Sequence, residues 1–368
     1  MQRVSVSNLL PGMVVARNIH DANGKLLLAG GFTLNQKFID GLAQQGIVSI
    51  YIENSLLEQE SVEDFLREET RVAAVKSVKS YFSHYSLTGK ADVEQVKTAA
   101  NQIVDEIILN PEAMVQLTDI RTHNDYTFAH SVNVCALSVL LAAAMSYNQE
   151  RLRELALGAL LHDVGKVEIS NAILNKPAQL DPDEWRIMQH HPKAGFQLLK
   201  KRGNVSTPAM IISYAHHERY DGTGYPRGVA GDEIHEYARL VAIADVFDAV
   251  TADRPYRSGL MLHEAYDVLM AGSGAQFDPR LLAKFLQAIA VYPVGSVVEL
   301  SDGAIAIVKK VHPGVSWRPT VQMLADAAFN TAVRGRTVDL RDELALTVRK
   351  VFREREVLSL MKQLNLPW

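Results

Sequence analysis

Histidine and aspartate gather in the middle of this 368-residue chain, where six of its twelve histidines lie between positions 130 and 217. The stretch HHERYDGTGYP, residues 216–226, places two histidines side by side ahead of a glycine-rich turn. The histidines and the aspartates that accompany or follow them are His130, His162, Asp163, His190, His191, His216, His217, Asp245 and Asp248. Imidazole and carboxylate together suit borderline divalent metals such as iron, manganese, nickel and zinc. Cys135 is the only cysteine, so a structural zinc site built on several cysteines is excluded.

His162 and Asp163 are adjacent, and the surrounding pattern predicts that both lie on a helix. On a helix their side chains diverge by about 100°. A carboxylate has two oxygens, so Asp163 could serve two metals at once and hold them ~3.5–4 Å apart, the spacing used in two-metal phosphoester hydrolysis. Such a site would keep a net positive charge, attract a phosphodiester anion and lower the pKa of a bound water.

Three segments carry a family resemblance: HDVGK (162–166), HHERYDGTGYP (216–226) and IADVFDAVTADRPYR (243–257). In this order and spacing they resemble the HD-GYP phosphodiesterases, a branch of the HD metallohydrolase superfamily, over residues 124–279. The resemblance implies a first metal held by His130, His162, Asp163 and Asp245, and a second held by Asp163, as the bridging and catalytic carboxylate, with His191, His216 and His217. His191 is chosen over His190 because the family's ligand immediately precedes a proline, here Pro192.

Some family members bind a third metal through a glutamate four residues before the first histidine, where this chain has Tyr126. We therefore expect two divalent transition metal ions. Iron or manganese is preferred, and nickel or zinc is the alternative. Lys166 is expected on the same helical face as His162, where it would contact a non-bridging phosphate oxygen or the leaving oxygen; an ordinary surface lysine is the alternative.

Other residues of the three motifs are expected to bind substrate or to support the ligands. Arg254 and Arg257 match family positions that hold substrate phosphate; ion pairing with Asp253 or Glu218 is the alternative. Asp248 lies one helical turn after Asp245, where it could orient a ligand histidine or cap a helix.

The turn after the paired histidines is expected to shape the substrate pocket. Two adjacent imidazoles can converge on one metal only where a helix ends. Gly222 and Gly224 are predicted to supply unusual backbone dihedrals, and Pro226 to stiffen the loop. Tyr225 would then face the pocket, with its ring available to a purine or its hydroxyl to phosphate; simple packing of the loop on the helices is the alternative.

The elements that must position these residues follow from hydrophobic periodicity. We predict a mainly α fold with an all-helical HD-type core (119–290), preceded by a small α+β domain (1–58) and a helical connector (61–118), and followed by a small β-rich domain (291–335) and a C-terminal helix (336–368). In the first domain Asn23-Gly24 predicts a hairpin, residues 33–46 a helix and residues 47–53 a strand. Helix-spaced apolar residues at 93–107 predict core packing, with a connector or dimer helix as the alternative. A second hairpin is predicted at Asp302-Gly303, followed by a strand at 318–324, and residues 342–364 are predicted to be helical.

Composition narrows the classes of partner. The formal charge of −4 argues against a general nucleic-acid or polybasic membrane binder, so we expect no DNA, RNA or membrane partner. The apolar run 132–145, which contains Cys135, is too short to span a bilayer and predicts a buried helix. The N-terminus has no signal-peptide pattern, and we expect a cytoplasmic protein.

The resemblance implies hydrolysis of cyclic di-GMP to 5′-pGpG and GMP. Hydrolysis of another cyclic dinucleotide, 3′3′-cyclic GMP-AMP, is a close alternative, and a non-catalytic signalling module that binds the dinucleotide is a more distant one. The complete set of ligand residues argues against the latter. The residues at 61–118 could pair in a homodimer, and signalling proteins could be partners.

Overall fold

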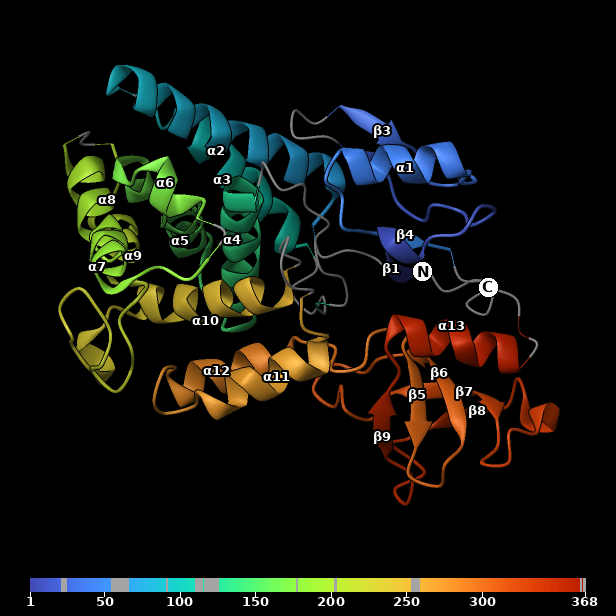
Figure 1. Cartoon of the computed structure of the whole chain (residues 1–368). Coiled ribbons are helices and arrows are strands. Elements are labelled where there is room, and N and C mark those ends of the chain that lie inside the picture. The colour runs from blue at the N-terminus through green and yellow to red at the C-terminus, as the bar shows by residue number, and fades with distance from the viewer. Residues whose placement is uncertain are drawn as a thin grey trace.

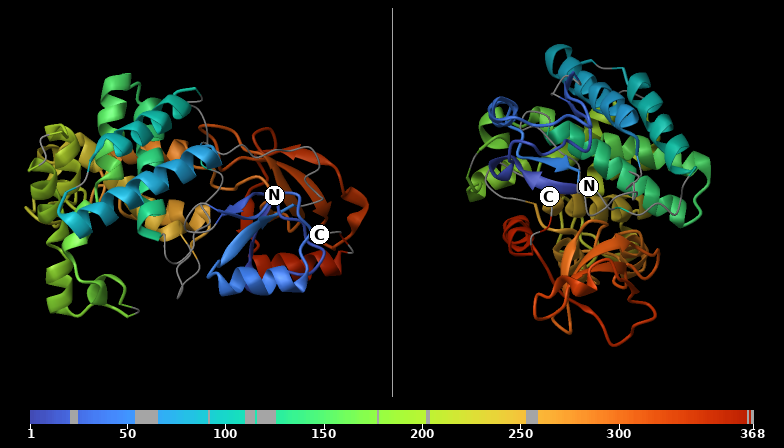
Figure 2. Two further views of the ribbon diagram at one scale, coloured as in Figure 1. Left: turned by 90° about the horizontal axis from the view of Figure 1, so that it is seen from above. Right: turned by 90° about the vertical axis from the view of Figure 1, so that its right-hand side faces the viewer.

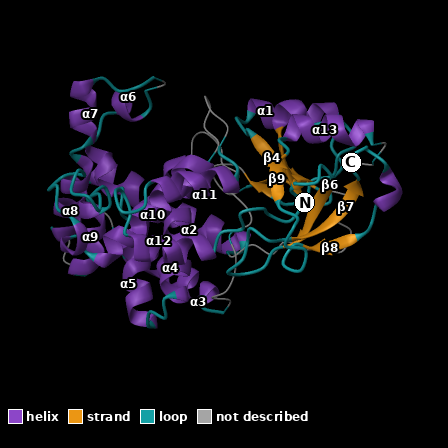
Figure 3. Cartoon of the chain, turned by 90° about the horizontal axis from the view of Figure 1, so that it is seen from below, coloured by secondary structure: helices purple, strands orange, loops and turns teal. Residues whose placement is uncertain are grey.

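Helices form one end of the molecule and two small β-containing units form the other (Figure 1, Figure 3). The computed structural model describes residues 1–20, 25–53, 66–90, 92–109, 115, 126–176, 178–201, 204–252, 259–364 and 366. The predicted fold class, a helical core with a small α+β unit before it and a β-rich unit after it, is confirmed.

The N-terminal unit contains two strand pairs and one helix. Its elements are β1 (Gln2–Ser5), β2 (Ile19–His20), β3 (Leu26–Leu28), α1 (Gln36–Gln44) and β4 (Ser49–Ile52). Antiparallel pairs form between β1 and β4 and between β2 and β3. The helix and strand predicted at 33–53 are confirmed, with Asn35 capping α1 through its side chain. The β2–β3 pairing agrees with the predicted hairpin, although its turn at 23–24 lies outside the described residues.

The helical part is built around α4. Its helices are α2 (Glu68–Thr88), α3 (Glu94–Ile107), α4 (Tyr126–Ala144), α5 (Gln149–Leu160), α6 (Asn171–Leu174), α7 (Pro182–Met188), α8 (His191–Lys200), α9 (Thr207–Ala215), α10 (Glu236–Thr251), α11 (Leu262–Ala271) and α12 (Pro279–Gln287). α4 packs against α2, α3, α5, α10 and α12. The predicted apolar stripe at 93–107 is buried in this same core, so core packing is confirmed for α3. The helices on both sides of the boundary predicted at residue 118 therefore share one hydrophobic core.

α4 is longer than the sequence predicted and is nearly all apolar. Its window Thr127–Ala144 has a mean hydropathy of 1.6 and is long enough to cross a membrane, contrary to the short run predicted. However, 78% of that window is buried inside the protein, as in the central helix of a folded core. Cys135 is fully buried there, as expected, and its Sγ donates to the carbonyl of Ala156.

The C-terminal unit is a five-stranded antiparallel sheet with one helix against it. Its elements are β5 (Val297–Leu300), β6 (Ile305–Lys310), β7 (Thr320–Ala325), β8 (Thr337–Asp339), β9 (Val348–Val351) and α13 (Glu354–Gln363), with strand order β8-β7-β6-β5-β9. The hairpin at Asp302-Gly303 and the strand at 318–324 are confirmed.

The helix predicted over 342–364 is wrong in its first half. Val348–Val351 is strand β9, which pairs with β5 and places Val351 opposite Val298. Only Glu354–Gln363 is helical. The β-branched valines fit the pleated edge of the sheet, and pairing with β5 overrides the charged, helix-like composition of the segment.

The N-terminal and C-terminal units lie next to each other, and both chain ends lie on their side of the molecule (Figure 2). The carboxylate of Glu354, at the start of α13, accepts hydrogen bonds from the backbone and side chain of Ser5 at 2.9 and 2.8 Å. The neighbouring Arg353 pairs with Glu264 of α11. These contacts hold both β-containing units against the end of the helical part.

Candidate metal centre

Three of the predicted ligand residues lie in helices, and the other four lie in turns that follow helices. His130 lies in α4, His191 is the first residue of α8, and Asp245 lies in α10. His216 and His217 directly follow α9, so the prediction that they lie where a helix ends is confirmed.

His162 and Asp163 do not lie on a helix, contrary to the prediction. α5 ends at Leu160, and the two residues occupy a turn before the 3₁₀ helix Val164–Glu168. Close packing explains this turn: a Cβ on Gly165 would lie 2.0 Å from the carbonyl oxygen of His191. The glycine therefore lets the turn approach the start of α8, which brings Asp163 beside His191.

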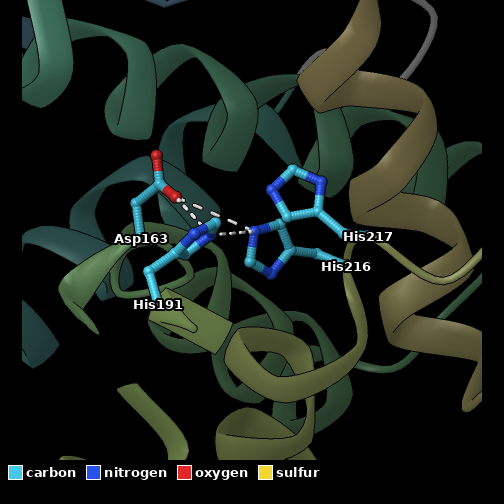
Figure 4. Close-up of side chains that lie close together, drawn as sticks. All are labelled: Asp163, His191, His216 and His217. Carbon is cyan, nitrogen blue, oxygen red and sulfur yellow. Dashed lines mark hydrogen bonds and ion pairs between the residues drawn. The ribbon is translucent and has the colours of Figure 1, made fainter. Parts of the chain in front are cut away.

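The seven residues form two groups, and within each group one ligand atom per residue lies within 4.8 Å of the others. The first group is His130, His162 and Asp245, and the second is Asp163, His191, His216 and His217. In the first group Nε2 of His130 lies 3.0 Å from Oδ1 of Asp245. Figure 4 shows the second group, in which Nε2 of His191 lies 3.3 Å from Nε2 of His216.

Asp163 lies between the two groups, and its side chain is 1% exposed. Its Oδ1 is 3.4 Å from Nε2 of His191 and 3.7 Å from Nε2 of His216. Its Oδ2 is 3.3 Å from Nε2 of His162, in the first group. One carboxylate thus presents one oxygen to each group, the arrangement that a bridging ligand needs.

Backbone carbonyls fix the orientation of several of these imidazoles. Nδ1 of His162 lies 2.8 Å from the carbonyl of Ala159, and Nδ1 of His191 lies 2.8 Å from that of Met188. Nδ1 of His216 lies 3.1 Å from two carbonyls of α9. A carbonyl can only accept, so each Nδ1 carries the hydrogen and each Nε2 offers a lone pair toward the centre.

These residues fit a transition metal site. Two ligand atoms that each lie about 2.1 Å from one ion are separated by roughly 3.0–3.4 Å, as most of the Nε2 and carboxylate atoms above are. Nε2 of His162 and Oδ1 of Asp163 are buried without a hydrogen-bond partner among the described residues. Buried polar atoms are rarely left unpaired, and these two point into the centre, where a cation would satisfy both.

The pKa values of the histidines differ between the two groups. Burial lowers the pKa of His191 to about 3 and that of His217 to about 4, and it holds the pKa of His216 well below its usual value. Burial alone would also lower the pKa of His130, but hydrogen bonds to Asp245 and Asp248 raise it to about 10. The three histidines of the second group are therefore neutral and ready to bind at pH 7, whereas His130 must release a proton first.

Asp163 remains ionised in spite of its burial. Burial alone would raise its pKa, but Lys166 and His162 hold it well below its usual value. Lys166 lies on the 3₁₀ helix rather than on one helical face with His162, because the helix predicted there ends early. Its Nζ lies 2.5 Å from Oδ2 of Asp163, so it contacts the carboxylate between the two groups.

Tyr225 lies beside the second group. Its ring stacks on that of His217, with centroids 4.8 Å apart and an interplanar angle of 27°. The ring of Trp185 from α7 lies at 78° to that of Tyr225, with centroids 6.2 Å apart. Burial raises the pKa of the Tyr225 hydroxyl, which is therefore protonated and can donate. One face of the ring is covered by the histidine, so only the remaining surface could meet substrate.

In the glycine-rich loop that follows His217, Gly222 has the predicted backbone dihedral, whereas Gly224 is needed for a different reason. Gly222 has φ +81°, as expected. Gly224 has no positive φ; its role is close approach, since a Cβ there would lie 2.3 Å from the amide nitrogen of Arg219. Glu218 is buried and accepts hydrogen bonds from the amides of Arg227 and Gly228 at 2.8 and 3.0 Å, which closes the loop on itself.

The remaining predictions have different outcomes. Asp248 contacts Nδ1 of His130 at 2.5 Å, so its orienting role, rather than capping, is what the structure supports. His190 is exposed, unlike its neighbour His191. Arg254 and Arg257 lie outside the described residues, as does the side chain of Tyr126.

Three residues at the centre were not predicted. Trp185 is half exposed next to Tyr225, and an exposed tryptophan on a short polar helix is a recognisable signal. Asn133 is buried in α4 and donates to Asp248; a lone amide within an apolar run could have revealed it. Arg71, from α2, donates to Asn133, and its sequence context gave no signal.

Known proteins share this architecture. A family model described as an HD domain matches residues 102–281, and one described as a KOW domain associated with HD domain matches residues 297–360. The cyclic di-GMP phosphodiesterase PA4108 of Pseudomonas aeruginosa is 36% identical over 281 residues, which cover 75% of this chain and 68% of that protein. The 3′3′-cGAMP-specific phosphodiesterase 3 of Vibrio cholerae is 40% identical over 168 residues, 46% of this chain and 36% of that protein. Among solved structures, an HDG"Y"P protein from Bdellovibrio bacteriovorus has a TM-score of 0.52 and 21% identity, and covers 77% of this chain and 98% of its own.

Proposed function

The chain belongs to the HD-GYP branch of the HD-domain family, and we propose that it is a metal-dependent phosphodiesterase that hydrolyses cyclic di-GMP. The observation that carries this proposal is the position of Asp163, which presents one oxygen to each of two histidine-rich groups. We propose that His130, His162, Asp163 and Asp245 hold one ion, and that Asp163, His191, His216 and His217 hold the other.

The ions, when bound, would bind the substrate phosphate and lower the pKa of a water for attack on phosphorus. The chain's own residues set the conditions for this step. The carbonyl-anchored histidines keep their Nε2 atoms converged without reorganisation. Lys166, 2.5 Å from Asp163, is placed to shift to a phosphate oxygen when substrate enters, since a lysine side chain has rotational freedom at its end.

The substrate assignment rests on the relatives, one named for cyclic di-GMP and another for 3′3′-cGAMP. Cyclic di-GMP is favoured because its relative is matched over 75% of this chain, against 46% for the other. The products would be 5′-pGpG and GMP. We propose that Tyr225, Arg254 and Arg257 contact the dinucleotide, the arginines through its phosphates.

Several finer points belong to the same proposal. Iron or manganese is the expected metal, with nickel or zinc as alternatives, because the donors are imidazole and carboxylate. We propose that the activity lies in the cytoplasm of a bacterial cell, where a nucleotide messenger would be its substrate. A homodimer through 61–118 and signalling proteins as partners remain predictions.

Two adjacent histidines provide the sharpest test. The protein is purified without oxygen, loaded with iron or manganese, and incubated with each dinucleotide while products are separated by chromatography. His191→Ala should lose one ion and reduce kcat by at least about 100-fold, since losing only a supporting partner of a metal ligand already costs roughly 10- to 100-fold. His190→Ala, the matched control on the exposed neighbour, should keep both ions and full activity.

The same assay separates the alternatives. Faster turnover of 3′3′-cGAMP than of cyclic di-GMP would assign the enzyme to the other substrate. Tight dinucleotide binding by the metal-loaded protein without any product would make it a binding module and would refute the proposed hydrolysis.

A further inference from the structure

A chain of buried polar contacts runs from α2 to the metal centre. The guanidinium of Arg71, 5% exposed, donates from Nη1 to Oδ1 of Asn133 in α4. Nδ2 of Asn133 donates to Oδ1 of Asp248 in α10 at 3.0 Å. Oδ2 of Asp248 lies 2.5 Å from Nδ1 of His130, whose Nε2 faces Asp245 in the first group.

The chemistry of these groups allows only one direction of donation. Arginine has donors and no acceptor, so the Asn133 amide must turn its oxygen toward Arg71 and its NH₂ toward Asp248. A carboxylate only accepts, so Nδ1 of His130 must carry the hydrogen. When His130 gives up its second proton, the lone pair is therefore confined to Nε2, the atom that the first group offers to a metal.

Because these groups are buried, breaking the contacts between them costs free energy. A buried guanidinium is costly unless its donors are hydrogen-bonded, and here Nη1 donates to Asn133, whose amide in turn donates to the carboxylate of Asp248. The arrangement holds three helices, α2, α4 and α10, in one relative position. A shift of α2 would therefore be felt at His130.

The N-terminal unit, here also called the N-terminal domain, contacts helix α2 about one turn before Arg71. Glu68, three residues before Arg71, pairs with Arg17 of that domain at 3.3 Å, and its other carboxylate oxygen lies 3.3 Å from Nδ1 of His20. Figure 1 shows α2 running from the N-terminal domain across the helical core. Helix α2 is thus attached to the N-terminal domain at its first turn and to the metal centre in its next.

We propose that Arg71 is a positioning residue of the metal centre, which sets the tautomer and orientation of His130 through Asn133 and Asp248. Through Glu68, the placement of the N-terminal domain then bears on the first metal group. This inference rests on the proposed metal-dependent function, but it concerns metal affinity and can be tested without turnover.

The test measures Mn²⁺ binding by titration calorimetry, with thermal unfolding of each metal-free protein recorded beside it. Arg71→Met should weaken the binding of one ion by ten- to 100-fold and leave the other unchanged, since supporting partners of metal ligands have effects of that size. Arg71→Lys, which keeps the positive charge and one donor nitrogen, should recover part of the loss. Glu68→Gln should weaken the same ion, by less.

Val78→Ala is the matched control, because Val78 is fully buried on the same helix and lies two turns beyond Arg71. It should lower the unfolding temperature while both Mn²⁺ affinities stay at the wild-type values. Asn133→Ser interrupts the same chain of polar contacts within α4. It is used in place of Arg71→Met if that variant does not fold.

Wild-type affinity for both ions in Arg71→Met or Asn133→Ser would overturn the proposal, as would an equal loss in Val78→Ala. An unchanged affinity in Glu68→Gln would overturn the link to the N-terminal domain. Absence of dinucleotide hydrolysis by the wild-type protein, with the Arg71 effect present, would refute the proposed function and leave this inference standing.

Discussion

Metal binding to the first group should depend on pH, because His130 is protonated in the metal-free chain. Hydrogen bonds to Asp245 and Asp248 raise its pKa to about 10 despite burial, so at pH 7 its Nε2 holds a proton. Binding a cation there must displace that proton. The three-unit gap to pH 7 corresponds to about 4 kcal/mol of binding free energy, and apparent affinity should rise about tenfold per pH unit from pH 6 to 9.

The second group should behave differently. His191 and His217, with pKa values of about 3 and 4, are neutral above about pH 5 and have no proton to lose. Saturation with two ions at pH 7 should therefore release about one proton from the ligand side chains, in addition to any proton lost by a bound water. In the metal-free chain the raised pKa of His130 has its own effect: it stabilises the fold below pH 6.5, and this stabilisation is lost as the pH rises through about 10.

Calorimetry of Mn²⁺ binding at pH 7, in buffers of different ionisation enthalpy, counts the released protons. Repeating the titration at pH 6, 7 and 8 gives the pH dependence of each affinity. His190→Ala, whose side chain is exposed, should leave both results unchanged. Two affinities that do not vary with pH, or no proton released, would refute the assignment of a charged His130 to the first group.

Three further outcomes follow from packing around the centre. Gly165→Ala should abolish two-ion binding, measured by metal content, because its Cβ would meet the carbonyl of His191 at 2.0 Å and push Asp163 away. Trp185→Ala should raise KM for the dinucleotide several-fold with kcat little changed, since its ring is half exposed beside Tyr225; an altered metal content would contradict this reasoning. Leu155→Ala, in the fully buried core, should lower the free energy of unfolding by about 2–5 kcal/mol, measured by urea denaturation.

The residue types and their spacing indicated a centre of histidines and carboxylates, and the family resemblance selected its individual residues. Paired histidines before a glycine-rich turn need a helix end, and His216 and His217 lie directly after α9. The choice of His191 over His190 agrees with their burial, since only His191 points inward. Apolar periodicity was equally informative for α3, whose stripe is buried as expected.

Local sequence patterns gave wrong predictions where contact with a segment distant in the sequence determines the structure. β9 is a strand because β5 offers an unpaired edge, which the charged sequence around Val348 does not reveal. The turn at His162 and Asp163 is set by the start of α8, against which Gly165 packs. Gly224 was correctly marked as special but for the wrong reason, since the backbone of Arg219 lies too close for any side chain.

The residues that orient the metal ligands were the hardest to predict, and the chain of buried polar contacts through Arg71 shows why. A metal needs a particular kind of atom, so its ligands are limited to few residue types and the sequence exposes them. A supporting residue needs only to complete a hydrogen bond, which many side chains and every backbone carbonyl can do. Asn133 lies three residues after His130 on the same helical face, so it could have been suspected. Arg71 is separated from Asn133 by 62 positions and joins it only because α2 packs on α4. Orientation of the metal ligands is therefore a property of helix packing, and substitutions that shift α2 should change metal affinity even where every ligand is intact.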